Sequence, residues 1–527
     1  MKRLILWLLF GLTILSCSIN GDQFQIKGVE SNPTLVAPIA YGDLSISDLL
    51  KKSDSSHITV GSDGLVSLIY DQNLVSHDIR NLVDIPDIGN KNFILAVPKG
   101  TYPANVNDYT STTSSQSVDM GISPEKLTEI AFKSGSLTYT MNLTPSNSNF
   151  NYAAQISISE FKSKATGASF VQEVTGSGTI PLSDYLFQSA VANTFTLKVT
   201  LVIKKNSSSS TVPINTNLNV TISFAGMDFN YVKGFLGDQV APIPPKVDSA
   251  SINIQAFGTS FQQGASVSFA QPTISLNVTT GYGVPLKVTF AKLEAQKSGS
   301  TLAMQTNPVS PITVAYPTVL GDSATTSVAI TNVNQLINFA PTKLFYQVSG
   351  HINQGLSSGN NFLADTSKMN VKLHVAIPLY GKASNIYLKD TVDLDLSNLD
   401  QTKIDSASLK ATITNQLPLD GNIQFILTDA NYVFIDSLLT ASQTNIIKGS
   451  TVDANGELQS PGITNTFIPL QLNTISDIFK AKKIIIKTRL NTSKSSAGVA
   501  VDVKFKSQYK IDFHLGLKTT LKLKATF

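Results

Sequence analysis

Apolar and polar residues alternate along most of the chain, in short runs separated by turn-forming residues. In one run the apolar side chains fall at every second position, at Phe195, Leu197, Val199, Leu201 and Ile203. Successive side chains of a strand point to opposite faces, so this pattern predicts strands with one buried and one solvated face. Such strands are typical of antiparallel sandwiches. The pattern therefore predicts an all-β fold.

A short motif recurs three times and predicts repeated modules. The sequence Ser-Leu-x-x-Thr begins at Ser136, Ser275 and Ser408. The second and third copies continue in register to an aliphatic-Pro-aliphatic triplet, at 284–286 and 417–419. In each of these two modules, residues at helical spacing predict a short helix before a strand, at 335–340 and at 475–481. We expect several tandem antiparallel β-sandwich modules with a few short helices.

The order of strand, aliphatic-Pro-aliphatic turn and strand resembles the sandwich modules of late-embryogenesis-abundant type 2 proteins. This resemblance covers the start of two modules. It implies a sandwich fold and no particular chemistry.

Breaks in the alternation predict the domain boundaries. Residues 109–117 form a Ser/Thr run, and 241–245 contain three prolines that remove backbone donors and stiffen the chain. At about 100–200 residues per domain, the chain has room for three or four domains. We predict a β-rich N-terminal domain over 34–118 and sandwich modules over 119–240, 246–400 and 401–527.

The first seventeen residues are typical of an export signal. Lys2 and Arg3 precede an apolar run over 4–15, which is shorter than the roughly twenty residues of a membrane-spanning helix. The run ends in Ile14-Leu15-Ser16-Cys17, which resembles the lipobox of bacterial lipoproteins. The resemblance implies a signal peptide over 1–16, acyl chains on Cys17 and a polar tether over 17–33. The alternative is an ordinary secretory signal that contains a cysteine.

Lipidation of Cys17 would anchor the chain in the outer membrane of a Gram-negative cell, facing either the periplasm or the medium. The residues after Cys17, at 18–22, include one acidic group. Acidic clusters at that place resemble surface-export tags, so this composition favours the periplasmic face.

Composition narrows the choice of partners. Charged residues make up 14% of the chain and the net charge is +4, so there is no broad basic field and nucleic acid is not an expected partner. Cys17 is the one cysteine, which excludes a disulfide framework and a multi-cysteine metal site. The polar residues of the chain are instead mostly Ser, Thr and Asn.

No motif in the chain predicts catalysis or a cofactor. Residues 355–359 spell G-L-S-S-G and match a nucleophile elbow, but Asn360 and Asn361 follow where that elbow needs a helix. We therefore predict a Gly/Ser loop. The five histidines lack zinc-site spacing, and His374 and His514 fall in alternating strands.

Two acidic segments resemble the start of calcium loops. Residues 393–397 place oxygen ligands at every second position, but they lack the required Gly at Asn398 and the Glu at Ile404. We predict a strand there, and a turn over 453–457. No metal site is expected.

The C-terminal strand has a basic outer face. Apolar side chains from Tyr509 to Leu517 alternate with Lys510, Asp512 and His514. A terminal Phe527 on such a strand also resembles the assembly signal of outer-membrane barrels. The alternation elsewhere is too Ser/Thr-rich for a lipid-facing surface, so we favour the last hairpin of a sandwich.

These observations predict an envelope lipoprotein with a binding or scaffold role, no catalysis, and contacts to a protein or glycan. One alternative is a carrier of lipid or another apolar ligand, which would need a large internal apolar pocket. Another is a hydrolase whose carboxylates come from distant strands and face each other in a cleft. A solid core with exposed Tyr and Phe would favour the binding role.

Overall fold

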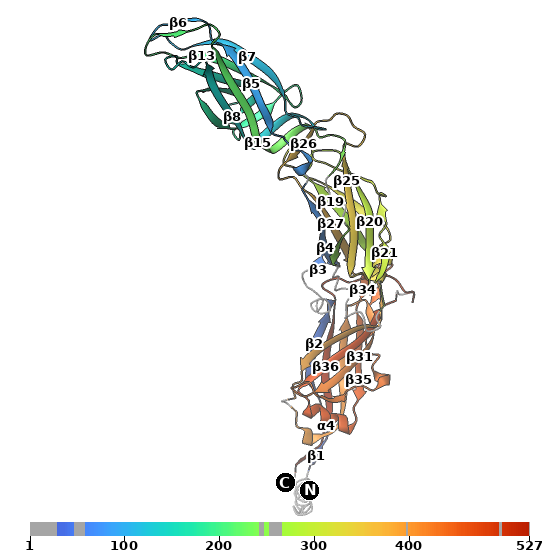
Figure 1. The fold of residues 1–527 in the computed structure, drawn as a ribbon. Coiled ribbons are helices and arrows are strands. Elements are labelled where there is room, and N and C mark those ends of the chain that lie inside the picture. Colours follow the sequence, from blue (N-terminus) through green and yellow to red (C-terminus); the bar gives the residue numbers. More distant parts are fainter. Residues whose placement is uncertain are drawn as a thin grey trace, which may run out of the picture. The chain divides into compact units, whose positions relative to one another are not determined.

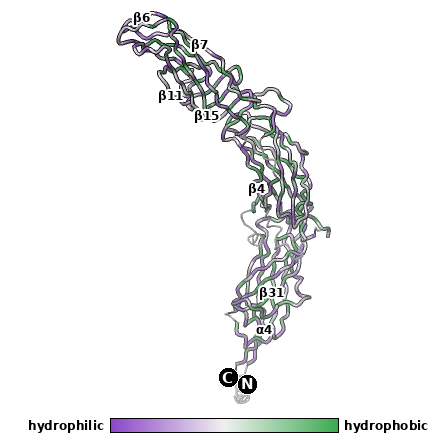
Figure 2. Tube along the Cα trace, in the orientation of Figure 1, coloured by the Kyte–Doolittle hydropathy of each residue, from purple (hydrophilic) through white to green (hydrophobic). Residues whose placement is uncertain are grey.

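The computed structural model describes residues 29–46, 58–78, 80–241, 247–251, 266–396, 399–494 and 498–525. Antiparallel strands dominate these ranges (Figure 1). Hydrophobic and hydrophilic residues alternate along the strands (Figure 2). The prediction of an all-β fold is confirmed. The predicted signal peptide over 1–16, Cys17 and most of the predicted tether over 17–33 lie outside the described residues.

The chain forms two compact units, and each is assembled from separate segments. Unit 1 takes the described residues of Met1–Leu68, Gln255–Gln271 and Ile377–Phe527. Unit 2 takes those of Ile69–Ile254 and Pro272–Ala376. Neither unit coincides with a predicted domain.

Unit 2 contains a first sandwich, called sandwich A. One sheet has the order β5-β15-β8-β11, and the other has the order β7-β13-β9-β10. At one edge β12 (Tyr185–Gln188) pairs with both β8 and β9 and joins the two sheets. The strands of the first sheet are β5 (Ile88–Ala96), β15 (Asn217–Phe235), β8 (Lys126–Thr144) and β11 (Ser177–Pro181). Those of the second are β7 (Tyr109–Asp119), β13 (Thr194–Ile203), β9 (Tyr152–Ser163) and β10 (Ser169–Val174).

Unit 2 also contains sandwich B. Its sheets have the orders β4-β27-β19-β24 and β17-β25-β20-β21. The strands of the first sheet are β4 (Val66–His77), β27 (Met369–Pro378), β19 (Thr273–Thr280) and β24 (Ala324–Ile330). Those of the second are β17 (Asp248–Ser251), β25 (Lys343–Ile352), β20 (Leu286–Lys297) and β21 (Ser300–Ala303). The Tyr346 hydroxyl on β25 donates a hydrogen bond across the core to the carbonyl of Leu74 on β4.

Unit 1 contains sandwich C. Its sheets have the orders β2-β38-β30-β35 and β29-β36-β31-β32. The strands of the first sheet are β2 (Thr34–Ser45), β38 (Lys510–Leu521), β30 (Ile404–Asn415) and β35 (Gly462–Pro469). Those of the second are β29 (Ile386–Asp393), β36 (Lys483–Thr492), β31 (Leu419–Thr428) and β32 (Phe434–Ser437).

The three sandwiches repeat one strand order, and the Ser-Leu-x-x-Thr motif occupies the same strand in each. That strand is β8, β19 or β30. The motif leucines Leu137, Leu276 and Leu409 are all fully buried. The short helices are also present, as α3 (Val333–Phe339) before β25 and α4 (Leu472–Lys480) before β36. The predicted repeat is confirmed.

The repeats are nested along the chain and not arranged in tandem as predicted. All strands of sandwich A lie between β4 and β17 of sandwich B, and all strands of sandwich B lie between β2 and β29 of sandwich C. The predicted N-terminal domain over 34–118 is accordingly divided among the sandwiches: β2 pairs with β38, β4 with β27, and β5 with β15.

The predicted boundary near residue 400 is also wrong, because β29 pairs with β36 of sandwich C. The predicted C-terminal hairpin is wrong too, since β38 lies between β2 and β30. Alternation specifies which face of a strand is buried but not which strand lies beside it.

The core of sandwich A is built around Phe161 on β9. Its ring centroid lies 5.0 Å from that of Phe195, 5.3 Å from that of Phe132 and 6.2 Å from that of Phe224 on the facing sheet. All four side chains are buried. Close-packed aromatic contacts of this kind join the two sheets and leave little room for a ligand between them.

We expect Phe161→Ala to lower the free energy of unfolding of unit 2 by about 3–5 kcal/mol, because it leaves a cavity at the centre of this cluster. Urea titration followed by near-ultraviolet circular dichroism measures the change. The control is Val191→Ala at a side chain that is 64% exposed, for which we expect a change of less than about 0.5 kcal/mol. Equal effects of the two substitutions would contradict this account of the core.

Candidate functional site

The G-L-S-S-G segment forms a loop between β25 and β26 (Asn361–Ala364) and precedes a strand, not a helix. The Gly355 amide donates to Asp238 Oδ2 at 2.8 Å, and His351 Nε2 lies 2.6 Å from Asp238 Oδ1. These two contacts hold the pKa of Asp238 below its usual value, the amide contributing most. The predicted Gly/Ser loop is confirmed, and Asp238 fixes its conformation.

The two strand histidines lie on outward faces. His374 Nδ1 on β27 lies 2.8 Å from Asp71 Oδ1 on β4, and Lys372 Nζ lies 3.0 Å from Asp71 Oδ2. His514 is exposed on β38. In the described part of the chain, no group of three or more His, Cys, Asp and Glu side chains could hold a metal ion.

The two acidic segments are explained by local structure. Asp393 ends β29 and forms an ion pair with Lys483 at 2.7 Å. Asp453 Oδ1 accepts hydrogen bonds from the amides of Asn455 at 2.9 Å and Glu457 at 2.8 Å, which builds a tight turn. The strand predicted over 393–397 is wrong beyond its first residue, because β29 ends at Asp393 and residues 394–396 are not strand. The turn predicted over 453–457 is confirmed. Ser397 and Asn398 lie outside the described residues.

A polar cluster surrounds Glu129 on β8 in sandwich A. Lys233 Nζ lies 2.8 Å from Glu129 Oε1, and Gln188 Nε2 donates to Oε2 at 3.3 Å. Burial, followed by a hydrogen bond to Glu129, raises the pKa of Tyr231 to about 12. The neighbours of Glu129 in this cluster are therefore a cation, an amide and a phenol, which is not the pair of facing carboxylates that a glycosidase mechanism needs.

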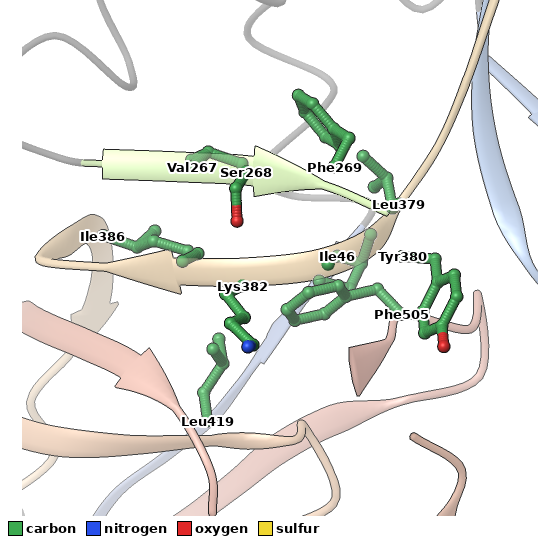
Figure 3. A pocket seen from close by; sticks show the side chains of 12 residues that line it. Ile46, Val267, Ser268, Phe269, Leu379, Tyr380, Lys382, Ile386, Leu419 and Phe505 are labelled. Atoms are coloured by element: carbon green, nitrogen blue, oxygen red, sulfur yellow. The ribbon is translucent and has the colours of Figure 1, made fainter. Parts of the chain in front are cut away.

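Unit 1 has a small apolar cavity beside a three-stranded sheet formed by β18 (Ser266–Phe269), β28 (Tyr380–Ser384) and β37 (Val503–Lys504) (Figure 3). Its lining includes Ile46, Leu419 and Phe505. The cavity has a volume of about 40 Å³. That space admits one or two small groups, whereas drug-sized ligands occupy pockets of roughly 300–1,000 Å³.

A larger, polar groove lies on the outer face of the β29-β36-β31 sheet, with a volume of about 380 Å³. Strand register places its side chains in rows across the sheet. Arg489 on β36 lies between Tyr387 on β29 and Asn422 on β31. In the next row Lys487 lies beside Gln424. Side chains two residues apart share a face, so both cations project from the same surface.

Hydrogen bonds hold the groove in shape. Gln424 Nε2 donates to the Leu439 carbonyl at 2.7 Å, and its Oε1 accepts from the Leu439 amide at 3.2 Å. These bonds fasten the 439–444 segment as a wall beside the floor formed by β31 and β36. Arg489 Nη1 donates to Asn385 Oδ1 at 2.8 Å, which orients the guanidinium.

The groove is lined by two cationic side chains, Lys487 and Arg489. Among the described residues, the ion pairs involve other basic side chains, and neither Lys487 nor Arg489 takes part in one. The nearby Asp420, two residues before Asn422 on β31, has a pKa raised by burial, although Lys494 partly opposes the rise. Two uncompensated cations beside a phenol and an amide can bind an anionic group and the hydroxyls around it.

No local sequence pattern singles out Tyr387, Asn422, Lys487 or Arg489. Along each strand these residues look like ordinary members of a solvated face. They become a site only because β29, β36 and β31 pair in one register. A cluster of Asn, Gln, Lys and Arg on outward positions of β31 and β36 was the one available sign.

Comparison with known proteins adds little to this description. No family model matches the chain, and no curated protein matches it. The crystal structure of a "putative secreted protein" from Parabacteroides distasonis shares 10% identity, with 92% of this chain and 99% of that chain covered and a TM-score of 0.30. At so low a score, the fold described above stands on this chain's own strand pairing. Among the described residues, no helix has the length and apolar character needed to cross a bilayer.

We expect Glu129→Gln to lower the pKa of Tyr231 from about 12 toward 10, because the substitution removes the carboxylate charge that favours the neutral phenol. Absorbance at 295 nm between pH 8 and 12.5, taken as a difference from Tyr231→Phe, measures this pKa. A raised pKa stabilises the fold fully below the unfolded value and loses that effect as pH rises through the folded value. Stability should therefore fall between about pH 10 and 12 in the native sequence and less steeply in Glu129→Gln. An unchanged phenol titration would contradict the assigned contact.

Proposed function

We propose that this chain is a lipid-anchored protein of the cell envelope that binds an acidic glycan in the groove of unit 1. The observation that carries the binding proposal is the pair of uncompensated cations, Lys487 and Arg489, on a shaped groove with Tyr387 and Asn422. Carboxylate or sulfate groups match the cations, and sugar hydroxyls match the amide and phenol. A tyrosine ring also offers a flat surface to a sugar ring.

The competing functions receive less support from the described residues. A lipid carrier needs a large apolar pocket, and the apolar cavity of about 40 Å³ is too small for an acyl chain. The core of sandwich A is filled by the aromatic cluster around Phe161. Exposed aromatic side chains, including Phe467 with Lys518 Nζ 4.9 Å from its ring centroid, favour a binding surface.

The anchoring part of the proposal rests on the lipobox-like sequence that ends at Cys17. Two or three acyl chains there would hold the mature protein stably on the outer membrane, since each buried methylene contributes about 0.8 kcal/mol. The periplasmic and the external face are both compatible with a glycan ligand.

Affinity electrophoresis tests the groove. We expect native protein to be retarded in gels containing polygalacturonate, a carboxylated glycan, and not in gels containing neutral dextran. The double variant Lys487→Gln/Arg489→Gln should bind polygalacturonate at least about tenfold more weakly, because charged hydrogen bonds contribute about 1.5–3 kcal/mol each.

The matched control is Lys198→Gln/Lys287→Gln, which removes the same charge from strands β13 and β20 of unit 2. We expect it to bind almost as well as the native protein. Equal losses in the two double variants would indicate charge attraction without a site, and native protein that runs unretarded would rule out a carboxylated glycan as the ligand.

Metabolic labelling with a radioactive fatty acid tests the anchor. We expect label on the native protein, which should sediment with outer membranes. Cys17→Ala should abolish the label and weaken the association of the protein with outer membranes. Protease treatment of intact cells then distinguishes the two faces, because a chain that faces the medium is digested before the outer membrane is opened. An unlabelled native protein would refute lipidation.

A further inference from the structure

An apolar hairpin tip projects from sandwich C. Tyr432 and Val433 lie between β31 and β32, Phe434 is the first residue of β32, and the three residues are 57%, 60% and 63% exposed. Within the described residues, no other run of three consecutive large apolar side chains is exposed to this degree. Isolated exposed apolar residues are ordinary, but a contiguous group marks a surface that meets another phase or molecule.

The tip has a fixed conformation. Asp429 Oδ1 accepts hydrogen bonds from the amides of Asn431 at 2.8 Å and Val433 at 2.9 Å. The Tyr432 amide donates to the Asp429 carbonyl at 3.2 Å, and Tyr432 adopts a left-handed φ of 63°. Such a backbone conformation is disfavoured for a residue with a Cβ. The three apolar side chains are thus presented outward by a rigid turn.

The tip lies at the end of sandwich C where the described chain begins. Strand β1 (Val29–Ser31) pairs with β39 (Leu523–Ala525), directly after the end of β38. Helix α4 follows β35 at this end and leads into β36, whose first residue Lys483 pairs with Thr428. Thr428 immediately precedes the tip. Figure 1 shows α4 and β1 at the same end of the sandwich.

Other exposed apolar residues occur at the same end. Leu35 and Val36, both 49% exposed, lie at the beginning of β2. Leu523 on β39 is 38% exposed and pairs with Ser31. The basic side chains here are largely neutralised, because Lys480 pairs with Asp477, Lys483 with Asp393 and Lys524 with Glu30. The surface is therefore apolar and close to neutral.

The distance to the proposed anchor favours a bilayer as the occupant. From Cys17 to Val29 there are twelve residue steps, which span at most about 40 Å when fully extended. An acylated Cys17 would hold this end of sandwich C within that distance of the membrane surface. Aromatic side chains prefer the boundary between headgroups and acyl chains, and a tethered surface binds at a high effective concentration.

We propose that the Tyr432–Phe434 tip inserts into the bilayer surface and orients sandwich C on the membrane. This inference rests on the proposed lipidation of Cys17. Because the surface is neutral, the tip should bind zwitterionic vesicles as well as anionic ones. Insertion gives the anchored protein a second point of attachment, with the groove of unit 1 held at a defined height above the lipid.

A tryptophan placed at the tip tests the proposal. Trp7 is the one tryptophan of the chain and would be lost with the proposed signal peptide, so Phe434→Trp introduces a single tryptophan into the mature protein. We would purify the acylated variant and reconstitute it in phosphatidylcholine vesicles brominated near the headgroups. We expect the bromine atoms to quench the fluorescence by about half or more, as for an interfacial side chain.

Two further variants secure the result. Val433→Trp should be quenched to a similar extent and guards against misfolding of the first variant. Tyr41→Trp, at a side chain that is 79% exposed on the outer face of β2, should remain unquenched. If the tip variants are not quenched on a protein whose Cys17 carries acyl label, insertion of the tip is refuted and lipidation of Cys17 is not. Equal quenching of Tyr41→Trp would also refute insertion of the tip, because the whole unit would then lie against the lipid. A protein without acyl label would refute both the lipidation of Cys17 and the insertion of the tip.

Discussion

The pairing between strands that are very distant in sequence is the constraint on which the structure depends. In unit 1, β2 near one end of the described chain hydrogen-bonds to β38 near the other, over a register that runs from Thr34 opposite Thr520 to Ser45 opposite Lys510. Without β2, one edge of β38 would have unpaired donors and acceptors, which are costly when shielded from water. Gly42 belongs to the same contact, since a Cβ there would lie 2.6 Å from the buried ring of Phe513. Both sheets of sandwich C, and so the groove and the tip, rest on this ladder.

Much of the fold could be predicted from local sequence, because period-two alternation and helical spacing are local properties. The repeat of Ser-Leu-x-x-Thr marks equivalent strands, since its leucine fills the same core position each time. Strand partners could not be predicted, because nothing in the 34–45 segment specifies a partner more than 450 residues away. For that reason the sequence does not reveal the nested order of the repeats, and the domain predicted over 34–118 combines strands that belong to three different sandwiches.

The groove could not be predicted from the sequence either, because it also depends on which strands pair. Lys487 and Arg489 alternate with buried residues of β36, as solvated residues do in any antiparallel strand. They line a groove only together with Tyr387 on β29 and Asn422 on β31, and both of these strands are far from β36 in the sequence. A nucleophile elbow or a calcium loop, in contrast, needs a fixed local sequence, so a departure from it can be recognised from a few residues such as Asn360 and Ile404.

The nesting has a consequence for the order in which the three sandwiches are completed during synthesis. A chain that emerges from its N-terminus delivers β2 first, then β4, and then all strands of sandwich A, which is the first sandwich with every strand present. Sandwich B is complete only when β27 arrives, and sandwich C only when β38 does. The earliest strands must therefore wait longest for their partners, with open edges that favour aggregation. A holding chaperone that covers β2 and β4 would protect these open edges. A stop codon anywhere before β38 would leave β2 without the strand with which it pairs.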